Sequence, residues 1–353
     1  MSELPLEISN VTKHFQTGFL NLRKVLAVEN LTLSLQPNEI VGLLGPNGAG
    51  KTTTLKMVTG LIFPTTGEIR LFGMPVVHRE ARQRMGFLPE NPYFYDYLTA
   101  EEFLHMACGL ANMPLLGRQA RVDHMLHKLG IYHARHLPMR KFSKGMLQRA
   151  GLAAALIHDP DLVILDEPLS GLDPLGRRDF REIILELKRE GKTVLFSSHI
   201  LPDVEDLCDR VAIIVKGKLR EEGRLDSLLE RGTRTTDIDV RTTTNVLPIT
   251  TLLNNASIEC NSTLSGYRLS LPPGVDRQHV IKRLMDAGYE VLSVRPHRVS
   301  LEDLFVSHAL EESVPPTPSV QTQDTLAKNS IQHHDTNESS ATQTDSKDED
   351  KSR

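Results

Sequence analysis

The chain has 353 residues, of which 39% are hydrophobic and 24% are charged, and its formal net charge is −4. This length exceeds one ordinary domain, and the composition is that of a globular protein with a sizeable core and no strong electrostatic bias. We therefore expect no nucleic-acid partner. The three cysteines lie far apart and match neither a disulfide framework nor a metal-binding pattern, which fits a reducing, cytoplasmic setting.

The sequence offers no segment for crossing or leaving the membrane. No stretch approaches the roughly 18 consecutive apolar residues of a membrane-spanning helix, and the first ten residues lack the basic and apolar regions of a signal peptide. We therefore expect a protein that neither spans a membrane nor is exported. Any role at a membrane then depends on a partner.

The N-terminal part alternates between strand-like and helix-like patterns. Residues 5–15 and 31–35 alternate apolar and polar side chains, which predicts two half-exposed antiparallel strands separated by a loosely patterned stretch, 16–24. The apolar run 40–44 predicts a buried strand that leads through a glycine-rich loop into a helix over 51–59.

The middle of the chain is predicted to hold an inserted helical subdomain at about 90–150. Thr99 and Glu102 have the spacing of a capping box, and apolar residues follow at helical spacing. The chain then returns to helices and strands in alternation, which implies parallel strands with crossover helices. These elements are a helix over 147–157, a strand over 162–165, a helix after Pro174, and strands over 193–197 and 211–215.

Beyond Gly232 the pattern predicts a small α+β domain of the split βαβ type, followed by a polar tail. The tail is nearly free of large apolar residues, so we expect it to be disordered. The expected domain limits are 4–230, 233–308 and 311–353. Within the second domain the expected elements are strands over 238–240, 258–260, 267–271 and 290–294 and a helix over 278–287.

The glycine-rich loop matches a phosphate-binding P-loop, and it stands where that motif requires, after a strand and before a helix. Its residues are Gly45, Pro46, Asn47, Gly48, Ala49, Gly50, Lys51, Thr52 and Thr53. Backbone N–H groups in such a loop surround phosphates, Lys51 adds a cation for the β- and γ-phosphates, and the Thr52 hydroxyl can bind Mg²⁺.

A second motif supplies carboxylates. The apolar strand 162–165 ends in Asp166 and Glu167. Taken alone, such a pair after a strand is more often the start of a helix, but together with a P-loop it predicts that Asp166 holds Mg²⁺ through water. Glu167 is then expected to orient or deprotonate the water that attacks the γ-phosphate.

Three further motifs resemble those of the ATP-binding-cassette (ABC) family. They are the signature-like segment 142–149, the segment 170–173, which is similar to the family's D-loop, and His199, which stands at the place of its switch histidine. The resemblance covers roughly residues 4–230. It implies an α/β P-loop NTPase fold of the ABC type, with an antiparallel β subdomain and an inserted helical subdomain.

The resemblance also implies how ATP is bound and hydrolysed. It implies a head-to-tail homodimer in which Ser143 and Gly145 of one subunit contact the γ-phosphate of ATP on the other subunit's P-loop. His199 is expected to hydrogen-bond the γ-phosphate, and Asp173 to bridge the two sites. In this family adenine stacks on an upstream aromatic residue, for which Phe15 fits better than Phe19.

Two departures from the family pattern are visible. Lys144 and Met146 replace the glycine and glutamine that are commonest in the signature motif, although Ser143 and Gly145 are kept. Glu90 stands where the family usually has a glutamine that senses Mg²⁺ and links to the helical subdomain. A carboxylate can reach Mg²⁺ through water, so we expect altered tuning of coupling; the plain alternative is a surface glutamate in a turn.

Both departures resemble the branch of the family that serves small ABC-2-type permeases, as does the segment 300–305. This similarity favours export over import. It implies a separate ABC-2-like membrane permease that receives the subunit at the cytoplasmic face of the membrane, with a groove in the helical subdomain for the permease's cytoplasmic helix.

Two other functions compete with the transporter subunit. A soluble ABC ATPase of translation or chromosome maintenance fits the lack of a membrane segment. Those classes, however, carry two cassettes or a long coiled coil, and this chain shows neither. A nucleotide-binding regulator without turnover fits the altered signature and Glu90, but Glu167 and His199 argue against it.

Overall fold

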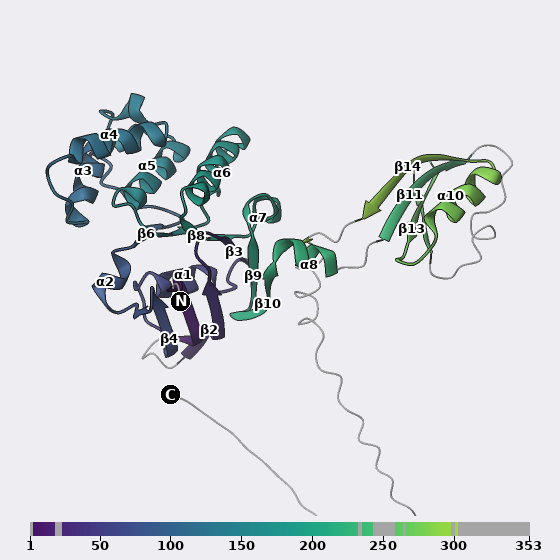
Figure 1. Ribbon diagram of the computed structural model, residues 1–353, viewed down its shortest axis with the longest axis horizontal. Coiled ribbons are helices and arrows are strands. Elements are labelled where there is room, and N and C mark those ends of the chain that lie inside the picture. The colour runs from purple at the N-terminus through teal and green to yellow at the C-terminus, as the bar shows by residue number, and fades with distance from the viewer. Residues whose placement is uncertain are drawn as a thin grey trace, which may run out of the picture. The chain divides into compact units, whose positions relative to one another are not determined.

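The computed structural model describes residues 3–17, 23–231, 235–242, 258–263, 266–297 and 301–302. Within these residues the chain forms three sheets (Figure 1). The largest has six strands in the order β10-β9-β3-β8-β7-β6, with β10 antiparallel to β9 and the other neighbours parallel. Its strands are β3 (Ile40–Leu44), β6 (Met85–Leu88), β7 (Leu162–Asp166), β8 (Thr193–Ser198), β9 (Arg210–Val215) and β10 (Lys218–Arg224).

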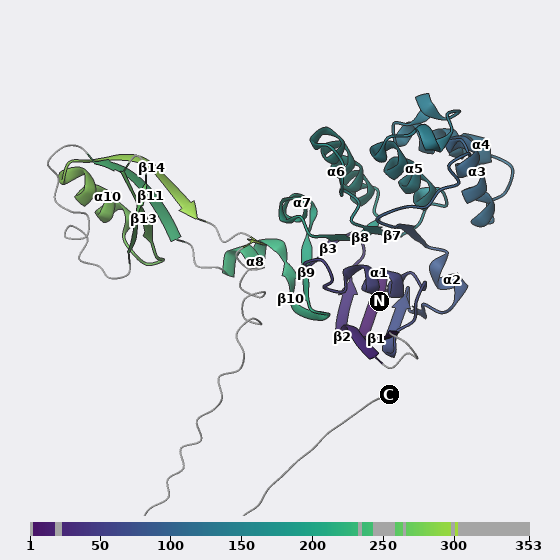
Figure 2. The same ribbon diagram turned by 180° about the vertical axis from the view of Figure 1, so that it is seen from behind.

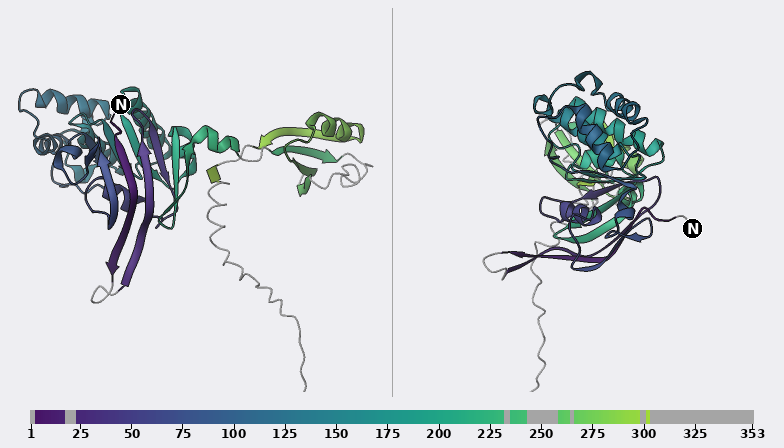
Figure 3. Two further views of the ribbon diagram at one scale, coloured as in Figure 1. Left: turned by 60° about the horizontal axis from the view of Figure 1, so that its bottom comes forward. Right: turned by 90° about the vertical axis from the view of Figure 1, so that its left-hand side faces the viewer.

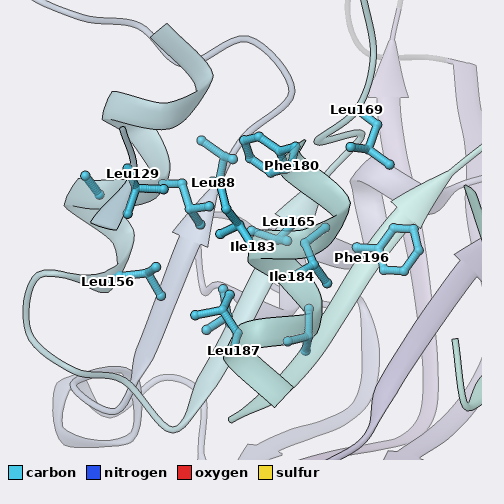
Figure 4. Close-up of a cluster of buried hydrophobic side chains, with 14 of the residues drawn as sticks. Leu88, Leu129, Leu156, Leu165, Leu169, Phe180, Ile183, Ile184, Leu187 and Phe196 are labelled. Carbon is cyan, nitrogen blue, oxygen red and sulfur yellow. The ribbon is translucent and has the colours of Figure 1, made fainter. Parts of the chain in front are cut away.

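The parallel strands of this central sheet are buried on both faces, and alternate residues along them enter different hydrophobic clusters. Val163 and Leu165 of β7 face a cluster with the helices α3 to α8, whereas Leu162 and Ile164 face a cluster with the smaller β-sheet and α1. In Figure 4, Ile183, Ile184 and Leu187 lie on one helix that crosses over Leu165 and Phe196 of the sheet. That helix is α6 (Pro174–Arg189).

The predicted antiparallel subdomain is a four-stranded sheet in the order β2-β1-β4-β5. Its strands are β1 (Leu6–Thr17), β2 (Arg23–Leu35), β4 (Thr66–Leu71) and β5 (Met74–Pro75). The prediction of a loosely patterned stretch over 16–24 was too long, because β1 and β2 continue as a hairpin that projects beyond the other strands (Figure 3). Register shifts interrupt the alternation of apolar and polar residues along this pair, so the full length of the strands cannot be recognised from the sequence pattern.

The helices of the cassette lie where the P-loop and signature motifs require. α1 (Lys51–Val58) follows β3, and the helical subdomain holds α3 (Ala100–Leu110), α4 (Arg118–Lys128) and α5 (Lys144–Leu156). The predicted capping box is present, since Thr99 and Glu102 exchange hydrogen bonds at the start of α3. The remaining helices are the short α2 (Arg79–Arg82), α7 (Leu201–Leu207) and α8 (Leu225–Arg231), and two 3₁₀ turns at Tyr132–Ala134 and Met139–Lys141.

The C-terminal residues form a separate α+β domain (Figure 2). A sheet in the order β12-β13-β11-β14 is covered on one face by α10, around the buried residues Ile238, Leu269 and Leu284. The helix connects β13 to β14, and β11 lies between these two strands and antiparallel to both, which is the split βαβ arrangement expected. The elements are β11 (Thr235–Thr242), β12 (Glu259–Thr263), β13 (Gly266–Leu271), α10 (Arg277–Asp286) and β14 (Tyr289–His297).

After β14 the described chain contacts the cassette at Leu301. This side chain is fully buried in the cluster that contains Val204 and Leu228, and its N–H donates to Glu205 Oε1 at 3.0 Å. Phe19, the predicted tail over 311–353 and most of the segment 300–305 lie outside the described residues. In the described part of the chain, no helix is long and apolar enough to cross a bilayer.

Candidate functional site

The P-loop lies between the buried strand β3 and helix α1. Gly50 caps α1 with φ 106°, and a Cβ at this position would lie 2.6 Å from the carbonyl oxygen of Ala27. Gly48 also has positive φ, 80°. Only glycine takes such conformations readily. The loop borders a cavity of about 570 Å³ whose lining is Val25, Leu26, Ala27, Pro46, Asn47, Gly48, Ala49, Gly50, Lys51, Thr52, Thr53, Glu90, Glu167, Ser170 and His199.

The Lys51 ammonium is held at the base of this cavity. Its Nζ donates to the carbonyl oxygens of Gly45 at 2.7 Å and Pro46 at 3.4 Å, and lies 3.2 Å from Glu167 Oε1. The residue is 6% exposed. A charge this deeply buried needs such partners, and together with the free N–H groups at the start of α1 it makes this end of the cavity suitable for phosphate.

Asp166 is tied to both neighbouring elements. Its Oδ1 accepts hydrogen bonds from the Thr52 hydroxyl at 3.3 Å and from the Ser197 hydroxyl at 2.6 Å. Ser197 in turn accepts the backbone N–H of Glu167 at 2.9 Å. The structure therefore brings together Thr52, which lines the cavity, and Asp166, two of the three residues predicted to bind Mg²⁺.

Glu167 has an unusual backbone. Its φ is 47°, in the left-handed region, which costs a non-glycine residue roughly 1–2 kcal/mol. The turn carries the carboxylate back into the cavity between Lys51 and His199, although the residue is only 8% exposed. Strain of this kind is typical of functional positions, because the surrounding structure must impose it.

His199 follows β8 and completes the group. Its Nδ1 is 2.8 Å from Glu167 Oε2, while Lys51 contacts the other oxygen of the same carboxylate. The imidazole side chain is 42% exposed, so its opposite edge remains open to a ligand. A buried carboxylate between a cation and an imidazole at the phosphate-binding end of a cavity has the groups needed to activate water.

Glu90 lines the cavity, and its main chain connects to the helical subdomain. The buried Gln148 of α5 donates its Nε2 to the carbonyl oxygen of Glu90 at 3.1 Å. Gln148 Oε1 has no hydrogen-bond partner among the described residues. A buried, half-satisfied amide links the segment after β6 to the helix that begins at the signature motif.

Ser143, Gly145 and Asp173 do not line this cavity, although Ser170, the first residue of the D-loop segment, does. Ser143 is exposed and caps α5 by accepting the N–H of Met146 at 3.3 Å, and the exposed Asp173 caps α6 by accepting the N–H of Gly176 at 3.1 Å. Gly145 lies beside Leu172 of the D-loop segment. Within one chain, these three predicted contacts to nucleotide are therefore separate from the P-loop side of the site.

The predicted adenine contact lies beside the cavity rather than in its lining. Phe15 on β1 is directly opposite Val25 on β2, and Val25 lines the cavity. Cross-strand partners project from the same face of a sheet, so Phe15 extends the apolar surface that Val25 begins. Phe15 is 36% exposed, and Lys13 Nζ lies 5.2 Å from its ring centre.

Four residues that position the site were not singled out from the sequence: Val25, Leu26, Gln148 and Ser197. The two hydrophobic side chains are about 40% exposed, and the run 25–28 gave no periodic signal that separates a strand from a loop. Ser197 is a polar residue near the end of a buried, largely apolar strand. Because a buried hydroxyl needs a hydrogen-bond partner, its position could have indicated a contact with the neighbouring strand that ends in Asp166.

Comparisons with known proteins agree with this geometry. A model of the ABC transporter family matches residues 28–170. The chain is 50% identical over 223 residues to an uncharacterised ABC transporter ATP-binding protein of Nostoc sp., covering 63% of this chain and 67% of that protein. It is 36% identical over 286 residues to the bacitracin transport ATP-binding protein BcrA of Bacillus licheniformis, covering 79% and 91%. A solved structure described as the ATP-binding subunit of an ABC transporter matches with TM-score 0.57 and 31% identity, covering 64% and 92%.

Proposed function

Because this chain belongs to the ABC transporter family as an ATP-binding, ATP-hydrolysing subunit, we propose that it binds Mg²⁺-ATP in the P-loop cavity and drives a separate membrane permease. The observation that carries the proposal is the contact of Lys51 and His199 with the two carboxylate oxygens of Glu167, a residue whose backbone is held in the left-handed region. The family assignment disfavours a soluble ABC ATPase of translation or chromosome maintenance.

Hydrolysis in this site is proposed to use the following groups. The P-loop N–H groups and Lys51 hold the phosphates, and Glu167 accepts a proton from water as that water attacks the γ-phosphorus. The bond between the γ-phosphorus and the β–γ bridging oxygen breaks, which yields ADP and inorganic phosphate. The edge of the His199 ring that faces away from Glu167 is proposed to contact the γ-phosphate.

The residues at the edge of the cavity fit a Mg²⁺ ion carried by ATP. Mg²⁺ prefers oxygen ligands and is usually bound by one or two carboxylates together with substrate phosphates and water. Thr52 and Asp166 supply a hydroxyl and a carboxylate, with Glu90 on the cavity wall, and no described cluster of three or more His, Cys, Asp or Glu side chains forms an all-protein metal site. The bound ion neutralises the phosphate charge that develops during transfer.

A second subunit is proposed to complete the site. Ser143 and Gly145 are available at the start of α5, and the first N–H groups and the dipole of that helix favour a phosphate. In the proposed head-to-tail dimer they contact the γ-phosphate of ATP on the partner's P-loop, and Asp173 lies between the two sites. Closure of this dimer is the proposed source of mechanical work.

The permease is proposed to dock in a groove between α2, α3 and α5. This groove, of about 800 Å³, has polar walls at Arg79, Arg82, Gln83, Asn112 and His158 and apolar walls at Met85, Ala107, Leu110, Ala111, Met113 and Ala154. It suits an amphipathic cytoplasmic helix with an acidic edge. The predicted groove was placed in the helical subdomain alone, whereas this groove is also lined by residues of the preceding helix, α2. Through it the subunit would be held at the cytoplasmic face of the membrane.

Export by an ABC-2-like permease is the direction we propose. The support is the likeness to a protein named for bacitracin transport together with the departures from the family pattern at Glu90 and Lys144.

The docking groove is tested by a pair of leucine variants. Leu110 lies in the groove and is 73% exposed, whereas Leu116 lies outside it and is 94% exposed. We expect Leu110→Glu to abolish co-purification with the co-expressed permease and leave the ATPase rate of the isolated subunit unchanged, and Leu116→Glu to change neither. Equal retention of the permease by both variants would refute the docking site.

The hydrolytic assignment is tested by Glu167→Gln. The amide is nearly isosteric but does not accept the proton, so turnover is expected to fall by about 10²-fold or more while ATP still binds. Phosphate release and equilibrium binding of ATP measure the two quantities. Equal turnover by the wild-type and Glu167→Gln proteins would remove Glu167 from the mechanism.

A further inference from the structure

An ion pair between a partly exposed arginine and a buried aspartate joins α6 to α7 close to the site. Arg177 Nη2 lies 3.7 Å from Asp203 Oδ2. Asp203 is 3% exposed, and no described residue donates a hydrogen bond to its Oδ2. Burial raises the pKa of Asp203, while the guanidinium groups of Arg177 and Arg181 lower it. An incompletely paired carboxylate at such a depth is costly, so its position calls for a role beyond packing.

Arg177 has a second contact, on the side of Glu167. Its Nε donates to the carbonyl oxygen of Leu169 at 3.3 Å. Leu169 is buried in the turn that starts at Glu167, and that turn is closed by a hydrogen bond from Ser170 N to the Glu167 carbonyl at 3.1 Å. The planar guanidinium therefore connects the turn that carries Glu167 to the side chain of Asp203.

Asp203 is linked to His199 through the main chain at the start of α7. It lies in the first turn of α7, which begins two residues after His199. His199 Nδ1 returns to Glu167 Oε2 at 2.8 Å. The contacts thus form a closed ring: from Glu167 through its turn to Arg177, from Arg177 to Asp203, and along the start of α7 to His199 and back to Glu167.

We propose that Arg177 and Asp203 are positioning residues for ATP hydrolysis. They fix the start of α7 against the turn after Glu167 and so hold the His199 imidazole at hydrogen-bonding distance from the carboxylate. Neither residue lines the nucleotide cavity, so both act through His199 and Glu167. The inference rests on the roles proposed above for those two residues.

The same two helices supply a matched control. Arg181 of α6 forms an ion pair with Asp206 of α7, but the Asp206 side chain is 58% exposed, and Arg181 has no described hydrogen bond to the Glu167 turn. Exposed pairs contribute little, typically about 0–1 kcal/mol. If any link between α6 and α7 were sufficient, the loss of this pair would have the same effect as the loss of the pair between Arg177 and Asp203.

The test compares Asp203→Asn and Asp206→Asn in the wild-type and His199→Ala backgrounds, with kcat and KM for ATP measured by phosphate release in Mg²⁺. In the wild-type background we expect Asp203→Asn to lower kcat by about tenfold, since small displacements of positioned groups have effects of this order. KM should stay within about twofold, and Asp206→Asn should leave both constants within about twofold. In the His199→Ala background, measured by single turnover with labelled ATP, Asp203→Asn should cause no further loss.

Arg177→Lys provides a second approach that does not depend on the folding of the Asp203 variant. A lysine keeps the charge but lacks the planar guanidinium that contacts the Leu169 carbonyl with one nitrogen and Asp203 with another. We therefore expect a similar loss of kcat, which is again absent in the His199→Ala background. An unchanged kcat in both variants, or an equal proportional loss in both backgrounds, overturns the proposal. Full activity of His199→Ala or Glu167→Gln alone would instead refute the proposed roles of those residues.

Discussion

The sequence assigns two regions of this chain to ATP binding, the P-loop and the signature motif. They differ in how many of their site residues contact one another within a single chain. Around the P-loop, Glu167 contacts both Lys51 and His199, and Lys51 and Glu167 are almost fully buried. Around the signature motif, Ser143 is exposed and its hydroxyl caps its own helix. The first region is assembled by the fold of one chain, whereas the second presents a helix N-terminus with no phosphate-binding partner in the same cavity. We infer that the second region acts on another subunit.

Lys51→Ala breaks the assembled region and should have the largest effect. It removes the cation at the base of the cavity and leaves Glu167 buried without its charge partner. We expect kcat/KM to fall by at least about 10²-fold, with weaker ATP binding as well as lost hydrolysis, since charge-assisted contacts contribute about 1.5–3 kcal/mol each. Isothermal titration with ATP measures the affinity. An unchanged dissociation constant would contradict the phosphate-binding role of Lys51.

Ser143→Ala probes the other region and separates it from the first. We expect turnover at saturating ATP to fall by about tenfold, since one ordinary hydrogen bond contributes about 0.5–1.5 kcal/mol, while ATP binding to the isolated subunit stays the same. Loss of the helix cap costs roughly 1 kcal/mol of stability, so thermal unfolding is measured in parallel. Ser143→Asn, which preserves a capping side chain, should lose turnover without that destabilisation. Weaker binding by the isolated Ser143→Ala subunit would mean that the signature motif serves its own chain's site.

Phe15→Ala should have the smallest effect, because Phe15 borders the assembled region without lining it. Stacking on a base contributes about 1–3 kcal/mol, and the exposed position of Phe15 favours the lower end. We expect about fivefold weaker binding of ATP and an unchanged kcat. Phe15→Tyr serves as the control and should bind normally. If Phe15→Ala bound ATP as tightly as the wild-type protein does, Phe15 would not be the adenine contact, and Val25 and Leu26 would be the next candidates.

Local patterns in the sequence were sufficient for most of the fold and for the assembled half of the site. The P-loop stands between an apolar strand and a helix, and the capping box at Thr99 and Glu102 is complete within four residues, so both can be read from neighbouring positions. The strand β4 escaped prediction because only Ile69 and Leu71 of its residues are buried, which leaves too short an alternation.

The parts that could not be predicted are contacts between distant segments. Gln148 reaches the carbonyl of Glu90, and Arg177 reaches both Leu169 and Asp203, across intervals that carry no periodic signal. The left-handed backbone of Glu167 is likewise imposed by its surroundings, among them Ser197, and glutamate has no intrinsic preference for it. These contacts set the geometry of the site, whereas the motifs determine only its chemistry.

The central claim is that one chain holds only half of a hydrolytic site, and the oligomeric state of Glu167→Gln tests it most directly. With turnover blocked, Mg²⁺-ATP should hold two subunits together, and light scattering after size exclusion should give twice the mass of one chain. The same protein with Mg²⁺-ADP, or Glu167→Gln combined with Ser143→Ala in Mg²⁺-ATP, should remain monomeric. A Glu167→Gln protein that binds ATP stoichiometrically and stays monomeric would contradict the account.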